Sequence, residues 1–389
     1  MHWPRVKTET LPWAPTPGTY PRRAAKKMPR EYEAAVVPMI ANQQLTLTEQ
    51  THALVEQATV AAVRFDTTDA HRVVPFTPLL LRSESTASSR IEQLTSSARK
   101  VLEAEATGRG RGNAALIAAN TRQMEAAVAR ARANVDGIVE MHQILLADSA
   151  PEIAGVLRGG QVWIGGSDYS PAGAMFVPPH QRHLTELMAD LGEFMARDDL
   201  PALAQAAIAH AQFETIHPFA DSNGRTGRAL VHVVLRERGL TTSSALPLSA
   251  GLLTDTAAYF AALDAYRGGD VDRIVQLFAR AAIDVAERGS WLAAELVAVR
   301  DEWNEQLTAR ADALAWRVLD LLLQRPVLTT AAVSTEFGVS AETARNALDR
   351  LEADGIVISA QLDKRQRGWR SPDVLALLDE FAEASGRRG

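Results

Sequence analysis

The 389-residue chain contains no cysteine, which excludes disulfides, thiolate zinc sites and cysteine nucleophiles. It has no uninterrupted apolar run of about eighteen residues, the length that would cross a membrane, and its first residues lack the apolar core of a signal peptide. Charge of either sign is not in large excess, since 41 basic and 47 acidic residues give a net charge of −6. Such a balance does not favour a polyanion as partner of the whole chain. We expect a soluble, cytoplasmic protein with no membrane partner.

The most informative stretch is 217–228, which reads HPFADSNGRTGR. An alanine-rich apolar segment with helical spacing precedes it over 203–216, and a second apolar segment follows over 229–235. The stretch therefore predicts a polar loop between two buried helices. A helix that begins near Gly224 would direct unpaired N–H groups and its dipole toward an anion.

The charged side chains of this loop suggest a specific chemistry. Arg225 and Arg228 are three residues apart, so on a helix both guanidinium groups face the same anion. Asp221 is a hard oxygen ligand suited to Mg²⁺ beside phosphates. His217 can accept a proton from an attacking hydroxyl. The pattern predicts transfer onto a hydroxyl from a metal-bound polyphosphate.

The stretch resembles the signature of the Fic family, His-x-Phe-x-(Asp/Glu)-Gly-Asn-Gly-Arg-x-x-Arg. One position differs from the signature, because Ser222 stands where the family usually has glycine. A polar interhelical loop with a chance arginine pair is the alternative. The matching positions are His217, Phe219, Asp221, Asn223, Gly224, Arg225 and Arg228.

The resemblance implies transfer of AMP from ATP to a Ser, Thr or Tyr hydroxyl of a target protein, with release of pyrophosphate. ATP and Mg²⁺ are the cofactors that it implies. His217 would deprotonate the hydroxyl, and Asp221 would hold Mg²⁺. The expected phosphate contacts are Asn223 and Gly224 to the α-phosphate, Arg225 to the β-phosphate and Arg228 to the γ-phosphate. Ser222, Thr226 and Gly227 complete the expected nucleotide loop, and Tyr259 is a candidate beside the adenine, with a core aromatic role as the alternative.

A second motif lies upstream, where Ser88, Glu92 and Gln93 resemble the Fic inhibitory motif (Ser/Thr)-x-x-x-Glu-(Gly/Asn). In the family this glutamate pairs with the second arginine of the signature, here Arg228, and keeps it from the nucleotide. Gln93 departs from the pattern. The same letters also fit a helix N-terminal capping box, Ser89 with Glu92, which needs no regulatory role.

Residues 158–179 contain two β-like runs around a turn cluster and predict a β-hairpin. The hairpin resembles the Fic flap, which binds the target's peptide segment as an added strand. A structural hairpin that covers a helix end is the alternative.

We expect a mainly α fold with a Fic helical core, one β-hairpin flap and a small C-terminal winged helix domain. Proline-rich residues 1–30 predict an extended arm without regular structure. The expected divisions that follow are 31–112, an N-terminal helical segment with the inhibitory helix, 113–310, the catalytic core, and 311–389, the winged helix-turn-helix. Residues 31–63 are expected to be mostly helical.

Winged helices commonly read DNA, but six basic and six acidic residues balance between Thr329 and Arg370. A duplex reader usually carries a net basic face. DNA binding by residues 312–389 therefore stays open without being favoured over partner binding or homodimerisation.

Other functions also remain open at this point. Related Fic chemistry could transfer UMP, or could remove AMP with Glu92 orienting water. The chain could instead be a DNA-binding regulator that uses the core as a nucleotide sensor, or an inactive scaffold. The intact His217 and Asp221 argue against the scaffold.

Overall fold

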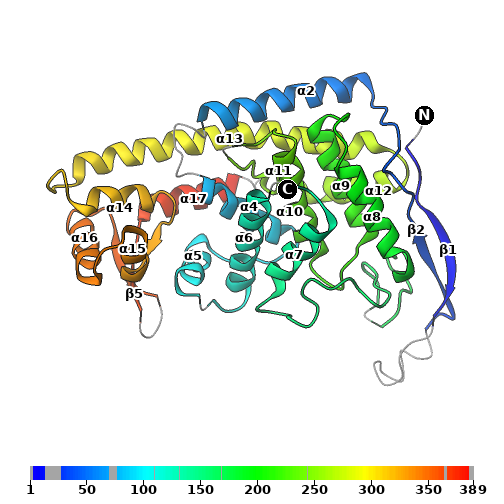
Figure 1. The fold of residues 1–389 in the computed structure, drawn as a ribbon, viewed down its shortest axis with the longest axis horizontal. Helices are drawn as coiled ribbons and strands as arrows, with labels where there is room; N and C mark the ends of the chain where they lie inside the picture. The colour runs from blue at the N-terminus through cyan, green and yellow to red at the C-terminus, as the bar shows by residue number, and fades with distance from the viewer. Residues whose placement is uncertain are drawn as a thin grey trace.

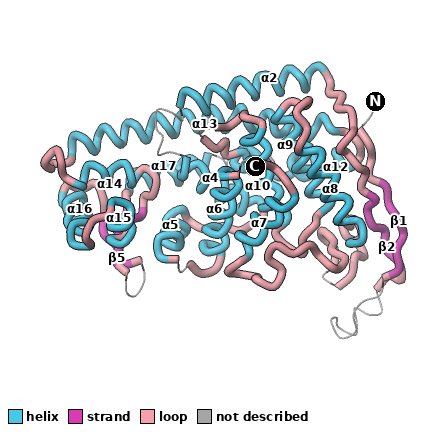
Figure 2. The backbone as a smooth tube through the Cα atoms, viewed as in Figure 1, coloured by secondary structure: helices cyan, strands magenta, loops and turns pink. Residues whose placement is uncertain are grey.

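The computed structural model describes residues 3–13, 28–69, 77–108, 110–130, 132–167, 169–242, 244–362 and 366–384. Helices make up most of the described residues, together with two small antiparallel sheets (Figure 1). Figure 2 colours the helices, strands and loops of the same view separately. The 36-residue helix α13 (Val271–Gln306) runs along the long axis and links a helical body to a smaller C-terminal unit. The mainly α prediction is confirmed. None of the described helices has the length and apolar character needed to cross a bilayer.

The helical body is built around α9 (Ala202–Ile216), whose residues from Leu203 onward are all buried. Its alanines allow α10 (Asn223–Glu237) to approach closely, and a Cβ at Gly227 of α10 would lie only 2.8 Å from the Phe213 ring of α9. This close packing fixes the start of α10 beside the end of α9. The two helices that the sequence predicted around the polar loop are thus confirmed.

Other helices surround this pair. Helices α6 and α7 pack on α10, α8 packs on α9, and α2 lies lengthwise on α13 (Figure 1). The bounds are α2 (Glu49–Arg64), a π-helical turn η1 (Phe65–Asp69), α4 (Thr77–Ile91), α5 (Ala98–Thr107), α6 (Asn113–Ala129), α7 (Val135–Leu146), a 3-10 turn η3 (Gln181–His183), α8 (Leu184–Met195), α11 (Leu248–Leu253) and α12 (Thr256–Arg267).

Two predictions for the N-terminal region are wrong. Lys7–Pro12, which was expected to lack regular structure, forms strand β1. Glu31–Val36, which was expected to begin a mostly helical region, forms strand β2 and pairs antiparallel with β1. Pro12 is tolerated because it ends the strand at the edge of a two-stranded sheet. The remaining prolines and the basic cluster within 14–27 lie outside the described residues.

Residues 158–179 reverse direction as predicted, but they do so through antiparallel bridges rather than continuous strands. Ile164 pairs with Phe176, and Ser167 pairs with Ser170. The Ile164 N–H donates to the Phe176 carbonyl at 2.8 Å, and the ring of Phe176 packs under the Arg267 guanidinium at 3.8 Å. We call residues 158–179 the flap.

The capping-box prediction for Ser89 and Glu92 is wrong, because Glu92 lies at the C-terminal end of α4 and not at the start of a helix. The Leu94 N–H donates to the Ser89 carbonyl at 3.0 Å, and the Gln93 N–H donates to the Arg90 carbonyl at 2.9 Å. These two bonds form a Schellman motif with Gln93 in the left-handed region at φ +62°. Gly and Asn adopt this conformation at less cost than glutamine, so the geometry accounts for the Gly or Asn of the family motif.

The C-terminal unit has the order of a winged helix. Its recognition-type helix α16 (Ala341–Ala353) is capped by Ser340, whose hydroxyl accepts from the Thr343 N–H at 3.1 Å. Strand β5 lies between β3 and β4 in its antiparallel sheet. The bounds are α14 (Leu314–Leu322), β3 (Val327–Leu328), α15 (Thr330–Phe337), α16 (Ala341–Ala353), β4 (Ile358–Gln361), β5 (Arg367–Arg370) and α17 (Pro372–Ala384).

Candidate active site

The polar loop is bounded by two residues in the left-handed region. His217 ends α9 at φ +50°, with its N–H donating to the Phe213 carbonyl at 2.8 Å. Ser222 precedes α10 at φ +62°. Left-handed conformations of non-glycine residues are costly and cluster at functional sites, where the surroundings hold them in place. These two conformations therefore fix where the loop leaves α9 and where it enters α10.

The loop is held from inside by Asn223 and Phe219. The Asn223 side chain accepts from the Phe219 N–H and donates to the Phe219 carbonyl, both at 2.9 Å. The Phe219 ring is fully buried and stacks on His142 of α7 at 3.7 Å. Because both of these bonds use its side-chain amide, Asn223 shapes the loop with its side chain. Only its backbone N–H is then left to contact an anion at the start of α10.

His142 and Arg158 support the loop but were not among the predicted site residues. His142 joins its Nε2 to the Asp221 carbonyl at 3.1 Å, and burial lowers the pKa of its imidazole to about 4. Arg158 donates to the carbonyls of His217 at 2.8 Å, Gly160 at 2.9 Å and Pro179 at 2.5 Å. One buried guanidinium thus ties both ends of the flap to the backbone of His217.

The His217 imidazole is held as a neutral base. Its side chain is 19% exposed, and Nδ1 lies 3.9 Å from the buried carboxyl of Glu214, one turn earlier on α9. Burial, together with the nearby Arg158 and Arg267, lowers the pKa of His217 to about 3. Burial raises the pKa of Glu214 to about 7, with Glu92 adding to the effect. At neutral pH His217 is therefore free to accept a proton.

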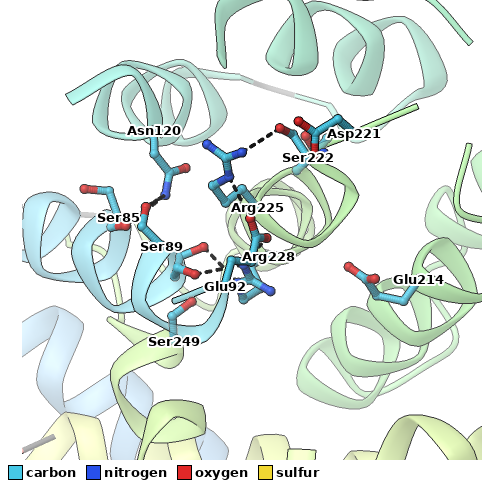
Figure 3. A network of polar contacts seen from close by, with 12 residues as sticks. Ser85, Ser89, Glu92, Asn120, Glu214, Asp221, Ser222, Arg225, Arg228 and Ser249 are labelled. Carbon is cyan, nitrogen blue, oxygen red and sulfur yellow. Dashed lines mark hydrogen bonds and ion pairs between the residues drawn. The ribbon is translucent and has the colours of Figure 1, made fainter. Parts of the chain in front are cut away.

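Glu92 reaches across from α4 and bonds to both arginines of α10 (Figure 3). Its Oε1 accepts from Arg228 Nη2 at 2.8 Å, and its Oε2 accepts from Arg225 Nε at 2.9 Å. Ser88 completes the contact, because its hydroxyl accepts from Arg228 Nε at 2.8 Å and its carbonyl accepts from Nη2 at 2.9 Å. The predicted pairing of Glu92 with Arg228 is present, and it extends to Arg225.

The Glu92 carboxylate lies where an anion would bind. A Cβ on Gly224, the second residue of α10, would collide with Glu92 Oε1, so only glycine leaves room there for an acidic group. The start of α10 and its two arginines together favour negative charge. The Glu92 carboxylate thus occupies a position that suits an anionic group.

The structure separates the predicted loop residues into two groups. Ser222, Gly224, Arg225 and Arg228 lie together around the Glu92 carboxylate, with Asp221 next to Ser222 (Figure 3), whereas His217 lies near Glu214 at the end of α9. Thr226 instead accepts a hydrogen bond from Gln123 of α6 at 3.0 Å, and Gly227 packs against α9. Tyr259 is 1% exposed and joins its hydroxyl to His210 at 2.8 Å. Thr226, Gly227 and Tyr259 are therefore buried in the helical core, which agrees with the alternative core role of Tyr259.

Ser222 combines a strained backbone with a useful side chain. Its hydroxyl accepts from Arg225 Nη2 at 2.6 Å and so orients that arginine. Ser222→Gly relieves the left-handed strain but loses this bond, so we expect the free energy of unfolding to change little. Ser222→Ala keeps the strain and loses the bond, so it is expected to destabilise by roughly 0.5–1.5 kcal/mol. Urea unfolding measures the free energy of unfolding of both variants. Equal values for the two would show that relief of the left-handed strain does not offset the lost hydrogen bond.

Two parts of the chain match known families. Residues 312–358 match the family described as Winged helix-turn-helix DNA-binding. Residues 132–235, which contain α7, the flap, α8, α9, the 217–228 loop and most of α10, match the Fic/DOC family. Residues 132–235 are therefore similar to a Fic domain. The resemblance drawn from the 217–228 signature is confirmed, and the inhibitory segment at the end of α4 lies outside the matched residues.

Similar proteins extend this result. The chain is 30% identical over 150 residues, 38% of its length, to "Protein adenylyltransferase fic-1" of Caenorhabditis briggsae, covering 27% of that protein. It is also 30% identical over 149 residues, again 38% of its length, to "Protein adenylyltransferase Fic" of Nematostella vectensis, covering 31% of it. The match thus spans less than a third of either relative. A Fic family protein from Desulfovibrio desulfuricans G20 shares the fold, with a TM-score of 0.56 at 23% identity over 84% of this chain and 97% of that one.

Proposed function

We propose that the chain is an auto-inhibited protein adenylyltransferase, which moves AMP from ATP to a hydroxyl side chain of a target protein. One observation carries the proposal. The same loop that carries a neutral His217 leads into the anion-binding groups Arg225 and Arg228, which the protein's own Glu92 occupies. The names of the two relatives, both protein adenylyltransferases, support the same reaction.

In the proposed reaction, His217 accepts the proton of the target hydroxyl as its oxygen attacks the α-phosphorus of ATP. The new O–P bond forms while the bond from the α-phosphorus to the bridging oxygen of the β-phosphate breaks, and pyrophosphate leaves. Arg225, Arg228 and the N–H groups at the start of α10 stabilise the negative charge of the phosphates. Positioning and charge stabilisation supply most of the rate enhancement at such a site.

Asp221 fits the part of a magnesium ligand. Asp221 is exposed beside the start of α10, and its Oδ1 accepts from the Ser222 N–H at 2.6 Å, which orients the carboxylate. In the described residues no group of three or more His, Asp or Glu side chains gathers to hold a metal ion by itself. Mg²⁺ often binds through one carboxylate together with substrate phosphates, where it neutralises phosphate charge. We therefore propose that Mg²⁺ enters with the nucleotide.

We propose that the flap receives the target protein. Arg158 joins its two ends to His217, so a peptide aligned along the flap would lie beside the base. Met175 is 80% exposed and Tyr169 is 40% exposed on this segment, which leaves apolar surface for a partner. Addition of an extended peptide to such a segment is a common mode of recognition.

The winged helix unit gives little support to DNA binding. Several of its described basic side chains are paired with acids: Arg345 with Asp349 at 3.5 Å, Arg350 with Asp354 at 3.0 Å and Arg367 with Glu352 at 2.9 Å. Lys364 and Arg365 lie outside the described residues. Paired side chains are less available to phosphates. Partner binding or homodimerisation through this unit stays a prediction from the sequence.

Nucleotide choice tests the reaction class. Glu92→Gly protein incubated with Mg²⁺ and ATP, UTP, GTP or CTP is expected to gain the mass of one AMP, on itself or on an added target, with ATP alone or strongly preferred. Intact-mass spectrometry measures the adduct. A preference for UTP would instead support UMP transfer. Loss of AMP from previously modified protein, requiring Glu92, would support the removal reaction.

A further inference from the structure

Helix α4 is held firmly along most of its length. Glu84 is fully buried, accepts from the Ser249 N–H at 2.7 Å and lies 3.0 Å from His232 Nε2 on α10. Ser85 shares a hydrogen bond of 2.7 Å with Thr121 of α6. If α4 moved away, the buried groups that bond to Glu84 and Ser85 would lose their hydrogen-bond partners, which would be costly. Relief of inhibition therefore cannot come from departure of the whole helix, and must involve the last turn, which carries Ser88 and Glu92.

The outer side of this last turn is bound by α17, the helix that follows the wing. Arg90 Nη1 donates to the Ala382 carbonyl of α17 at 3.1 Å. The Arg90 carbonyl in turn accepts from Gln93, the strained left-handed residue next to Glu92. The same turn thus contacts the catalytic arginines on one side and α17 on the other, and Figure 1 shows α17 extending from the winged helix unit toward α4.

The packing between α4 and α17 is incomplete. A cavity of about 490 Å³ lies between them, lined by Thr86, Ala87 and Arg90 of α4 and by Leu378 and Phe381 of α17, among others. Interiors are normally packed nearly as densely as organic crystals. Val374 and Phe381 pack α17 into the core, so the cavity leaves space for movement mainly beside the last turn of α4.

The position of α17 is coupled to the wing. It begins directly after β5, and the Ser371 N–H donates to the Pro326 carbonyl at 2.9 Å. Arg370 of β5 lies 3.3 Å from Glu103 of α5, so the wing also contacts the N-terminal helices. A displacement of β5 would therefore be passed to α17 and to the turn that it holds.

We propose that the outer face of the last turn of α4 is a docking surface for α17, and that docking holds Glu92 over Gly224. The winged helix unit then acts as an internal regulator of the Fic site, and undocking of α17 raises transfer. This inference rests on the proposed adenylyltransferase function.

The test is Arg90→Ala in the full-length chain, assayed by transfer of label from α-phosphate-labelled ATP. We expect a rise of about three- to tenfold, as the loss of one hydrogen bond of ordinary net strength would give, and no further rise when Arg90→Ala is added to Glu92→Gly. Hydrogen exchange should accelerate at residues 90–94 and not at 79–85. Arg99→Ala, an exposed arginine on α5, is the matched control and should change neither readout.

The outcomes separate the two proposals. If Glu92→Gly transfers label but Arg90→Ala leaves both transfer and exchange at the wild-type level, the docking proposal is overturned and the function stands. If Arg90→Ala raises transfer equally in the Glu92→Gly background, the arginine acts by another route, which also overturns docking. If Glu92→Gly itself transfers nothing, the proposed function fails, and accelerated exchange confined to residues 90–94 remains the readout for docking.

Discussion

Glu92→Gly is expected to raise AMP transfer by about tenfold to about a hundredfold. The carboxylate makes charge-assisted hydrogen bonds with Arg225 and Arg228, and a hydrogen bond to a charged group contributes about 1.5–3 kcal/mol. A difference of 1.36 kcal/mol corresponds to about tenfold in rate. Removing the side chain frees both arginines and the space above Gly224 for phosphates. The initial rate of label transfer from ATP measures the effect.

Gln93→Gly is the matched control for this change. It introduces the same flexible residue one position later, relieves the left-handed strain at φ +62° and leaves the Glu92 carboxylate in place. Transfer should therefore stay near the wild-type level. Glu92→Gly protein should also unfold more easily without nucleotide, since two arginines lose their partner, and should be restabilised by ATP. If Glu92→Gly binds ATP more tightly yet transfers no faster than wild type, Glu92 is not the inhibitory group.

His217→Asn in the Glu92→Gly background is expected to lower transfer by about 10²–10⁴-fold, the usual contribution of a general base. Asparagine suits this test because it tolerates the left-handed backbone at φ +50° better than alanine does. The affinity for ATP should be unchanged, because Arg225, Arg228 and the start of α10, which would bind the phosphates, are intact. Steady-state kinetics together with calorimetric ATP binding separate these effects, and equal losses of rate and affinity would contradict a role confined to proton transfer.

The pH profile gives a second readout for His217. Its pKa is lowered to about 3, and the base works in its unprotonated form, so its activity is lost only as the pH falls toward that value. At saturating nucleotide, transfer by Glu92→Gly protein should not show a loss centred near the ordinary histidine pKa of about 6.5. A loss centred there that vanished in the His217→Asn variant would show that the active histidine is not buried as described.

The sequence was most informative where chemistry and geometry are local. Residues 217–228 and the apolar segments 203–216 and 229–235 on either side predicted the polar loop, its two flanking helices and the shared face of Arg225 and Arg228, because neighbouring turns of a helix present side chains to a common point. The Glu92–Arg228 contact joins residues far apart in the chain, and it was predicted through the family resemblance alone. Local spacing cannot reveal such a contact.

Long-range contacts and backbone conformation account for most of what the sequence missed. Arg158 reaches His217 across 59 positions, and no periodicity marks it. Ser89 and Glu92 have the spacing of an N-terminal capping box, yet the same spacing lies at a helix end, where Gln93 adopts a left-handed conformation. The strand at Lys7–Pro12 depends on its partner strand at Glu31–Val36, which local propensity does not show.

The most direct test of the central claim is to compare ATP labelled at the α-phosphate with ATP labelled at the γ-phosphate. The account predicts that Glu92→Gly protein transfers the α label and not the γ label to protein, that wild type transfers little, and that Glu92→Gly/His217→Asn transfers almost none. Transfer of the γ label, or equal α labelling in wild type and Glu92→Gly, would contradict an adenylyltransferase held inactive by Glu92.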